Sequence, residues 1–239
     1  MERLPLFMPI VLPVLFWGAY HYHKDRHLPE PAGNLVLCFM LGLLAAGLSQ
    51  GLYMALEPLG LHHDAYALAA SNSVGLFVYS MLIIGPIEEI TKLLPFAVLV
   101  IRFRAFDEPM DGLIYASFIG LGYATAENFS YLDYLTPLEA AARGFAGPVV
   151  HILFASIWAL WISRAHLAGA SILRPALVGF ALASALHGLY DFLVLLQPIA
   201  ALPLAAALVV AIWIWRLHLL RRYHRDAVRD SGAQDRSMD

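Results

Sequence analysis

Charged residues are scarce in this chain, and cysteine is almost absent. Only 14% of the 239 residues are charged, 60% are hydrophobic, and the mean hydropathy is +0.68. This composition excludes an ordinary soluble domain and is typical of a protein with several membrane-spanning helices. The single cysteine, Cys38, excludes an internal disulfide, and we expect it to pack as a small hydrophobic residue. Because the sequence shows no internal repeat, we predict a single domain.

Apolar segments make up most of the chain. A helix needs about 20 predominantly apolar residues to cross a bilayer. Segments of that kind lie near residues 4–20, 35–56, 74–101, 112–133, 148–164, 175–196 and 200–219. The first lacks a small-x-small cleavage site, so we interpret it as an anchor and not as a signal peptide. We therefore predict an all-α polytopic membrane protein with about seven transmembrane helices in residues 1–220, followed by a disordered polar tail, residues 221–239.

Lysine and arginine are distributed unevenly between the predicted loops. One side would carry Lys24, Arg26, Arg102, Arg104, Arg164 and Arg174, together with a tail that holds Arg216, Arg221, Arg222, Arg225, Arg229 and Arg236. The other side would carry only Arg3 and Arg143. Because cytoplasmic loops are enriched in Lys and Arg, we predict an outside N-terminus and a cytoplasmic C-terminus.

Ionisable and polar residues interrupt the apolar segments at a few positions. They are Glu88, Glu89 and Lys92 in the third segment, Tyr123, Glu127 and Asn128 in the fourth, His151 in the fifth, and His187 and Asp191 in the sixth. A charged side chain at the centre of a membrane helix costs about 2.5–3.5 kcal/mol on insertion scales, and such residues usually mark a functional site. These residues are therefore our candidate site residues.

The heights of these residues in the bilayer are predicted to agree. At 1.5 Å per residue, Glu88, Glu127, His187 and Asp191 lie about 18 to 24 Å from the cytoplasmic ends of their segments. His151 enters from the opposite side, about one helical turn into its segment. The sequence therefore predicts one polar, hydrated layer in the outer half of the bilayer.

Spacing within the segments predicts particular contacts. Glu88 precedes Lys92 by four residues, so we expect the lysine to offset a carboxylate of the Glu-Glu pair. Glu127 shares a stripe with Tyr115, Tyr123 and Tyr131, whose hydroxyls we expect to donate hydrogen bonds to it.

Small residues and a proline predict how the helices pack. Residues at every fourth position, Ala116, Gly120 and Ala124 before Asn128, and Gly179 and Ala183 before His187, predict close helix contacts. Gly85-Pro86 predicts a kink or a restart of the helix just before the acids.

Each motif also has a purely structural interpretation. The Glu88, Glu89 and Lys92 set could be an interhelical clamp, and His187 with Asp191 could be a packing pair. Polar residues such as Glu127-Asn128 also hold membrane helices together. His151, just after Pro148, could lie at the membrane interface.

The motifs follow one another in a distinctive order between about residues 80 and 195. The order is Glu88-Glu89-x-x-Lys92, Asp107-Glu108-Pro109-x-Asp111-Gly112, Gly120-x-Gly122-Tyr123-Ala124-x-x-Glu127-Asn128, His151 and His187-x-x-x-Asp191. As a set they resemble the PrsW family of intramembrane proteases, which is similar in turn to prenyl endopeptidases and bacteriocin-processing or immunity membrane proteins. Tyr123 stands in this chain where the family's Phe-x-x-x-Glu motif has phenylalanine. Prenyl endopeptidases carry histidine in place of Glu127 and asparagine or similar in place of Asp191, so their mechanism transfers only in part.

The resemblance implies hydrolysis of a peptide bond in a membrane-anchored protein, such as extracytoplasmic cleavage of an anti-sigma factor, in a bacterial or archaeal inner membrane. The catalytic core would be residues 74–196. Glu88 or Glu89 would activate water and Lys92 would set their charge. His187 and Asp191 would stabilise the oxyanion or share the water. Glu127 and His151 would complete the pocket, with Asn128 and Tyr123 in support.

Metal dependence is left open by the sequence. Zinc could be held by His151, His187, Glu127, Asp191 and either Glu88 or Glu89. Because the chain lacks His-Glu-x-x-His, we favour a glutamate-activated water without a cofactor, with the zinc protease as the alternative. An ion or proton transporter and a non-catalytic binding protein are alternatives from other classes. We expect the bilayer and a membrane-anchored substrate as partners, and no nucleic acid.

Overall fold

A computed structural model of the protein describes residues 4–24, 29–131, 136–196 and 201–236, and the regular structure in these ranges is entirely helical. The α-helices are α1 (Leu4–Lys24), α2 (Ala32–Leu56), α3 (Ala65–Ser71), α4 (Ser73–Tyr79), α5 (Gly85–Val98), α6 (Pro109–Tyr131), α7 (Pro137–Leu167), α8 (Leu173–Leu195) and α9 (Leu202–Arg236). Short helices η1 (Glu57–Leu59) and η3 (Val100–Arg102) follow α2 and α5, and a π-helical turn, η2 (Ser80–Ile84), joins α4 to α5. The predicted all-α class is confirmed.

Several of these helices suit a membrane. Within the described ranges, four stretches are long and apolar enough to cross a bilayer, namely Ala32–Leu59, Ala140–Leu167, Leu173–Leu195 and Leu202–Arg222. Helices also occupy the other predicted segments, as α1, α4 with α5, and α6. A total of seven crossings and the orientation of the termini stay predictions.

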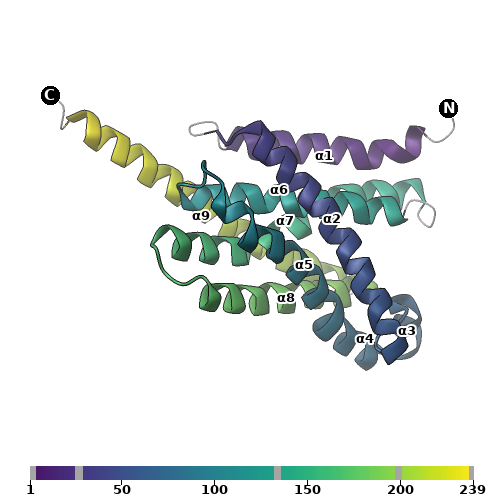
Figure 1. Ribbon diagram of the computed structural model, residues 1–239. Helices are drawn as coiled ribbons and strands as arrows, with labels where there is room; N and C mark the ends of the chain where they lie inside the picture. The colour runs from purple at the N-terminus through teal and green to yellow at the C-terminus, as the bar shows by residue number, and fades with distance from the viewer. Residues whose placement is uncertain (1–3, 25–28, 132–135, 197–200, 237–239) are drawn as a thin grey trace.

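The helices pack around a central pair. α6 and α7 make the most extensive contact among the described helices, α1 packs on both of them, and α2 crosses α6 (Figure 1). α5 packs against α8 and α2, and α8 packs against α7. Two of the largest buried side chains, Phe96 of α5 and Trp158 of α7, are in edge-to-face contact in the interior, and Tyr115 of α6 is buried toward the start of α2. This interior holds the candidate site described below.

Glycines allow two of the closest helix contacts. A Cβ atom at Gly120 would lie 2.9 Å from the backbone of His151, and one at Gly179 would lie 2.7 Å from Cα of Trp158. Both glycines belong to the predicted small-residue stripes, whose role in close packing is confirmed. The contacts bring α6 against α7 at His151 and α8 against α7 at Trp158.

The irregular winding before α5 lies where Gly85-Pro86 predicts it. The helix neither ends nor restarts there, because Ile84 and Gly85 both keep right-handed helical dihedral angles. Instead the N–H of Gly85 bonds the carbonyl of Ser80, five residues back. Since proline has no N–H to donate, a wider turn just before Pro86 is a low-cost way to accommodate it.

Two predicted boundaries are wrong. The fifth segment, predicted as 148–164, is part of a helix from Pro137 to Leu167 with Pro148 inside it. The tail, predicted to be disordered, continues α9 to Arg236 and carries it beyond the helical bundle (Figure 1). Residues 221–236 contain no proline and one glycine, so good helix formers such as Arg and Ala extend the helix that the apolar segment begins.

Candidate active site

Four helices bring the predicted site residues together. α5 supplies Glu88, Glu89 and Lys92, α6 supplies Tyr123, Glu127 and Asn128, α7 supplies His151, and α8 supplies His187 and Asp191. The carboxylates and imidazoles form a continuous chain of contacts no longer than 3.9 Å. The side chains therefore converge, and their common height in the bilayer stays a prediction. His151 is 3% exposed and lies inside the protein, not at an interface.

Glu89 lies in the closed half of the site. Its carboxylate accepts three hydrogen bonds, from Lys92 Nζ at 2.5 Å, His187 Nδ1 at 2.7 Å and Trp158 Nε1 at 2.8 Å. The side chains of Glu89 and Lys92 are both fully buried. This ion pair is satisfied by hydrogen bonds in the way that a buried charge requires, so Glu89 is a fixed anion within the core.

Lys92 offsets a carboxylate of the Glu-Glu pair, as predicted, although its spacing of four residues indicated Glu88. The lysine pairs with Glu89, three residues back, and not with Glu88. The reason is tertiary, since Trp158 and His187 also donate to Glu89 and hold its carboxylate on the side where the lysine lies. Lys92 Nζ also lies 4.8 Å from the ring centroid of Tyr123. Trp158 was not among our candidates, although a buried indole N–H usually requires an acceptor.

Glu88 faces the open half of the site. Its Oε2 atom lies 3.6 Å from His187 Nε2 and 3.9 Å from His151 Nδ1. This oxygen is buried and makes no hydrogen bond within the described residues. Because an unpaired buried carboxylate oxygen is costly, its position indicates a site built for a further ligand.

The two histidines are each oriented by a second carboxylate. His187 Nδ1 contacts Glu89, and His151 Nε2 lies 2.8 Å from Glu127 Oε2. When these contacts are N–H donors, His187 Nε2 and His151 Nδ1 carry the lone pairs that face Glu88. A carboxylate behind each imidazole is the usual outer arrangement of metal-binding histidines.

Glu127 lies near the entrance of the site. It is paired with Arg143 at 2.6 Å, and the guanidinium also lies over the ring of Tyr131 at 4.0 Å. The phenols that we predicted as donors to Glu127 do not serve it, because Tyr115 donates to Glu30 and Tyr123 donates to Ser49. Arg143 and His151 have taken that role. Arg143 was assigned to a loop by the sequence, and it contributes to the site from the start of α7.

Asp191 and two supporting residues complete the description. Asp191 Oδ2 lies 3.8 Å from His187 Nε2 and is a second buried oxygen without a hydrogen bond in the described residues. Tyr123 packs its ring on His151, with centroids 4.9 Å apart. Asn128 is buried beside Gly147, and its Oδ1 also makes no hydrogen bond in the part of the chain that the structure describes.

The residues present suit a divalent metal ion. Ligand atoms of Glu88, His151 and His187 all lie within 4.8 Å of one another and are buried. Two histidines and one glutamate are a ligand set found in zinc hydrolases. One feature opposes binding, since Lys92 Nζ lies 3.2 Å from His151 Nδ1 and competes for its lone pair. Glu89 offers the ammonium another partner at shorter range.

Fold and site together define a membrane-embedded hydrolase with carboxylate and imidazole groups inside a helical bundle. The chain belongs to the PrsW family, because residues 30–217 match the family described as PrsW family intramembrane metalloprotease. It is therefore an intramembrane protease, and the transporter and binding-protein alternatives are set aside.

Curated relatives support this assignment. The chain is 27% identical to Protease PrsW of Clostridioides difficile over 92% of both chains. It is 28% identical to Protease PrsW of Oceanobacillus iheyensis over 91% of this chain and 95% of the relative. Protease PrsW of Bacillus subtilis is 27% identical over 77% of this chain and 79% of the relative. No solved structure matches the chain.

Proposed function

We propose that this protein is a metal-dependent endopeptidase that cleaves a membrane-anchored protein, with Glu88, His151 and His187 as metal ligands. The observation that carries this proposal is the outer carboxylate behind each histidine. It leaves two imidazole lone pairs facing Glu88 Oε2, an oxygen without a hydrogen bond in the described residues. The family's description as a metalloprotease also favours this alternative over the metal-free mechanism that we preferred from the sequence.

The metal-binding atoms follow from the hydrogen bonds. Glu88 Oε2, His151 Nδ1 and His187 Nε2 would hold the ion. A bound zinc ion lowers the pKa of a coordinated water and polarises a carbonyl group, which supplies a nucleophile at neutral pH. Glu89 and Glu127 would keep the imidazoles oriented, since outer carboxylates of this kind typically change metal affinity 10- to 100-fold.

Other residues would handle protons and exclude solvent. Asp191 Oδ2 has no hydrogen-bond donor in the described residues and lies beside His187, so it can accept the proton of an attacking water. Lys92 and Trp158 hold the charge of Glu89 out of contact with water, which keeps the anion from acting as a second base. The water-activating role therefore belongs to the open half of the site.

The substrate class follows from the depth of the site. Glu127, Asp191 and Arg143 are the partly exposed members, with side-chain exposures of 24, 19 and 30%. They mark the side from which a peptide enters. In the predicted orientation that side is extracytoplasmic, so we propose cleavage near the outer end of a transmembrane segment, as an anti-sigma-like substrate would require.

The proposal is tested with purified full-length protein in liposomes that contain a single-span reporter protein. We expect exhaustive chelation to abolish cleavage and added zinc to restore it. Glu88→Gln should lower both the bound metal, measured by elemental analysis, and the rate of cleavage at least 100-fold. Glu57→Gln, an exposed change in η1, is the matched control and should leave both unchanged.

Two results would contradict the proposal. Cleavage that survives complete metal removal would favour the metal-free mechanism with Glu88 as the base. Full metal occupancy in Glu88→Gln would remove Glu88 from the ligand set.

A further inference from the structure

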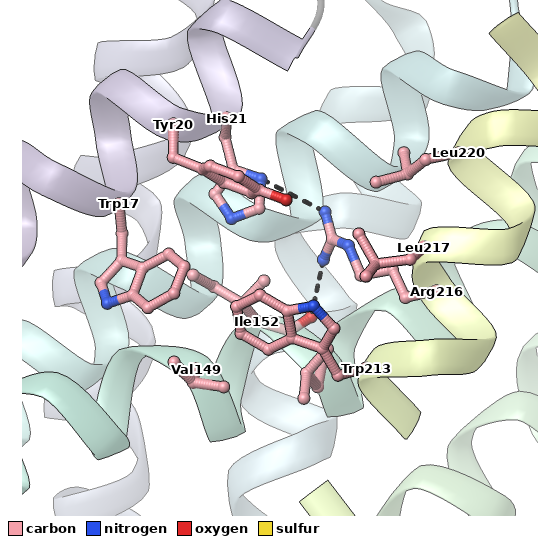
Figure 2. Close-up of a pocket in the computed structure, with 10 residues that line it drawn as sticks. Trp17, Tyr20, His21, Val149, Ile152, Trp213, Arg216, Leu217 and Leu220 are labelled. Atoms are coloured by element: carbon pink, nitrogen blue, oxygen red, sulfur yellow. Dashed lines mark hydrogen bonds between the residues drawn. The ribbon is translucent and has the colours of Figure 1, made fainter. Parts of the chain in front are cut away.

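A second polar feature lies outside the candidate active site, in a pocket between α1, α7 and α9. The pocket is lined by Trp17, Tyr20 and His21 of α1, Val149, Ile152 and Leu153 of α7, and Trp213, Arg216, Leu217 and Leu220 of α9. Figure 2 shows Arg216 reaching from α9 between His21 and Trp213. Ser117 of α6, which Arg216 contacts, precedes Glu127 by about 15 Å along the helix. On α7 the two sites adjoin, because Arg216 also bonds the carbonyl of Ile152, the residue after His151.

Arg216 is buried and bonded only to neutral groups. It is 3% exposed. Its Nη1 donates to Ser156 Oγ and to the carbonyl of Ile152, and its Nη2 donates to Ser117 Oγ, the carbonyl of Leu113 and His21 Nδ1. These contacts fix the plane of the guanidinium, but none of them neutralises its charge.

Two other cations that the structure describes inside the bundle differ from Arg216. Lys92 is paired with Glu89, and Arg143 is paired with Glu127. No carboxylate lies within 4.0 Å of Arg216 in the ranges that the structure describes. A buried charge without a counter-charge is costly, and within a membrane an anionic ligand can compensate for it. The sequence had counted Arg216 with the tail, which is wrong because α9 carries it into the core.

The position of the pocket suits a lipid head group. Arg216 lies about 21 Å along α9 from Leu202, toward the predicted cytoplasmic end. Trp17 and Trp213 are in edge-to-face contact at 5.4 Å, and Tyr20 lies beside Trp17. Trp and Tyr concentrate at the level of lipid head groups, and basic pockets between helices on the cytoplasmic side bind anionic head groups.

We propose that this pocket binds the phosphodiester group of an anionic phospholipid through Arg216. Guanidinium binds phosphate oxygens in a directed, planar way, and the pocket's largely apolar walls suit the glycerol and the first methylene groups. The pocket is narrow, so the acyl chains remain outside it, along the exposed faces of α1 and α9. The bound lipid would supply the counter-charge that no described residue provides.

The test is lipid binding to the delipidated full-length protein in nonionic detergent, followed by native mass spectrometry. The probes are phosphatidylglycerol, diacylglycerol with the same chains, and inorganic phosphate. We expect phosphatidylglycerol to bind at least tenfold more tightly than diacylglycerol. Arg216→Gln should weaken that binding at least tenfold. Arg221→Gln is the matched control, since it removes an exposed arginine of the same helix, and it should bind like the unmodified protein.

A second variant covers the case in which Arg216→Gln does not fold. Leu217→Trp narrows the pocket while Arg216 keeps its bonds to the serines, and it should also lose phosphatidylglycerol at least tenfold. Equal binding of phosphatidylglycerol and diacylglycerol, or retention of the lipid by Leu217→Trp, would overturn the proposal. Displacement of the lipid by millimolar inorganic phosphate would also overturn it, since the site would then serve a free anion.

Discussion

Neighbouring glutamates in α5 have opposite environments. Glu89 accepts three hydrogen bonds and is fully buried, whereas Glu88 has an oxygen without any hydrogen bond in the described chain. Their difference follows from the 100° between successive residues of a helix, which turns one toward Trp158 and the other toward the open half of the site. The same chemical group therefore has a structural role at one position and a proposed ligand role at the next.

This difference predicts opposite effects on stability. Glu89→Gln leaves Lys92 charged, buried and without a counter-charge, which should lower the free energy of unfolding by about 3–5 kcal/mol. Glu88→Gln should change it by less than about 1 kcal/mol, because the Glu88 carboxylate makes no hydrogen bond to the residues that the structure describes. Denaturant unfolding of the full chain in detergent, followed by tryptophan fluorescence, measures both. Equal destabilisation by the two substitutions would contradict our assignment of the buried ion pair.

At the scale of helices, glycine sets the distance between α8 and the turn η2. A Cβ atom at Gly188 would lie 2.4 Å from the carbonyl oxygen of Ser80, and one at Gly85 would lie 2.3 Å from that of Ser184. Backbone carbonyl groups cannot move aside to make room for a Cβ atom in the way that the end of a flexible side chain can. Because His187 precedes Gly188, this contact also fixes the position of an imidazole of the candidate site.

Gly188→Ala should therefore force α8 away from η2. We expect a loss of about 1–3 kcal/mol in stability, as in other overpacked interiors, together with a lower rate of peptide cleavage. Gly47→Ala is the control, because nothing lies within 4 Å of its would-be Cβ atom on α2. That change should be neutral or stabilise the helix by up to about 1 kcal/mol. If both variants unfold alike, the close contact does not determine the position of α8.

Helical periodicity explains what the sequence could and could not predict. Rise per residue determines height, so the common level of Glu88, Glu127, His151 and His187 follows from counting residues. Pairing depends on which neighbouring helix faces each side chain, and a single sequence does not specify that. For this reason the Lys92–Glu89 pair, the contact of Arg143 with Glu127 and the donor role of Trp158 became visible only in the structure.

At the scale of the whole molecule, the distribution of positive charge predicts the orientation in the membrane. Arg216 is buried in the core and does not belong to the tail, so it no longer counts among the cytoplasmic cations. The excess of Lys and Arg on the predicted cytoplasmic side remains large without it. The wetter half of the candidate site would then face the cell exterior. This orientation is also what places the proposed lipid pocket in the cytoplasmic leaflet.

Site-directed thiol labelling tests the orientation. Cys38 is fully buried and can be replaced by serine to give a background without thiols. A cysteine at position 2 should react with a membrane-impermeant maleimide in intact cells, and one at position 237 should react only after permeabilisation. Labelling of both positions in intact cells would mean an even number of crossings, and the opposite pattern would invert the predicted orientation.

The π-helical turn η2 determines the direction in which the site residues of α5 point. A π turn accommodates one residue more than regular winding allows, so every later side chain is rotated by about 100° relative to an uninterrupted helix. In an uninterrupted helix, Glu88 would take the direction in which Glu89 now points. The extra residue in η2 therefore determines which direction the two glutamates of α5 face. The apolar character of this segment alone does not explain why the extra residue is present.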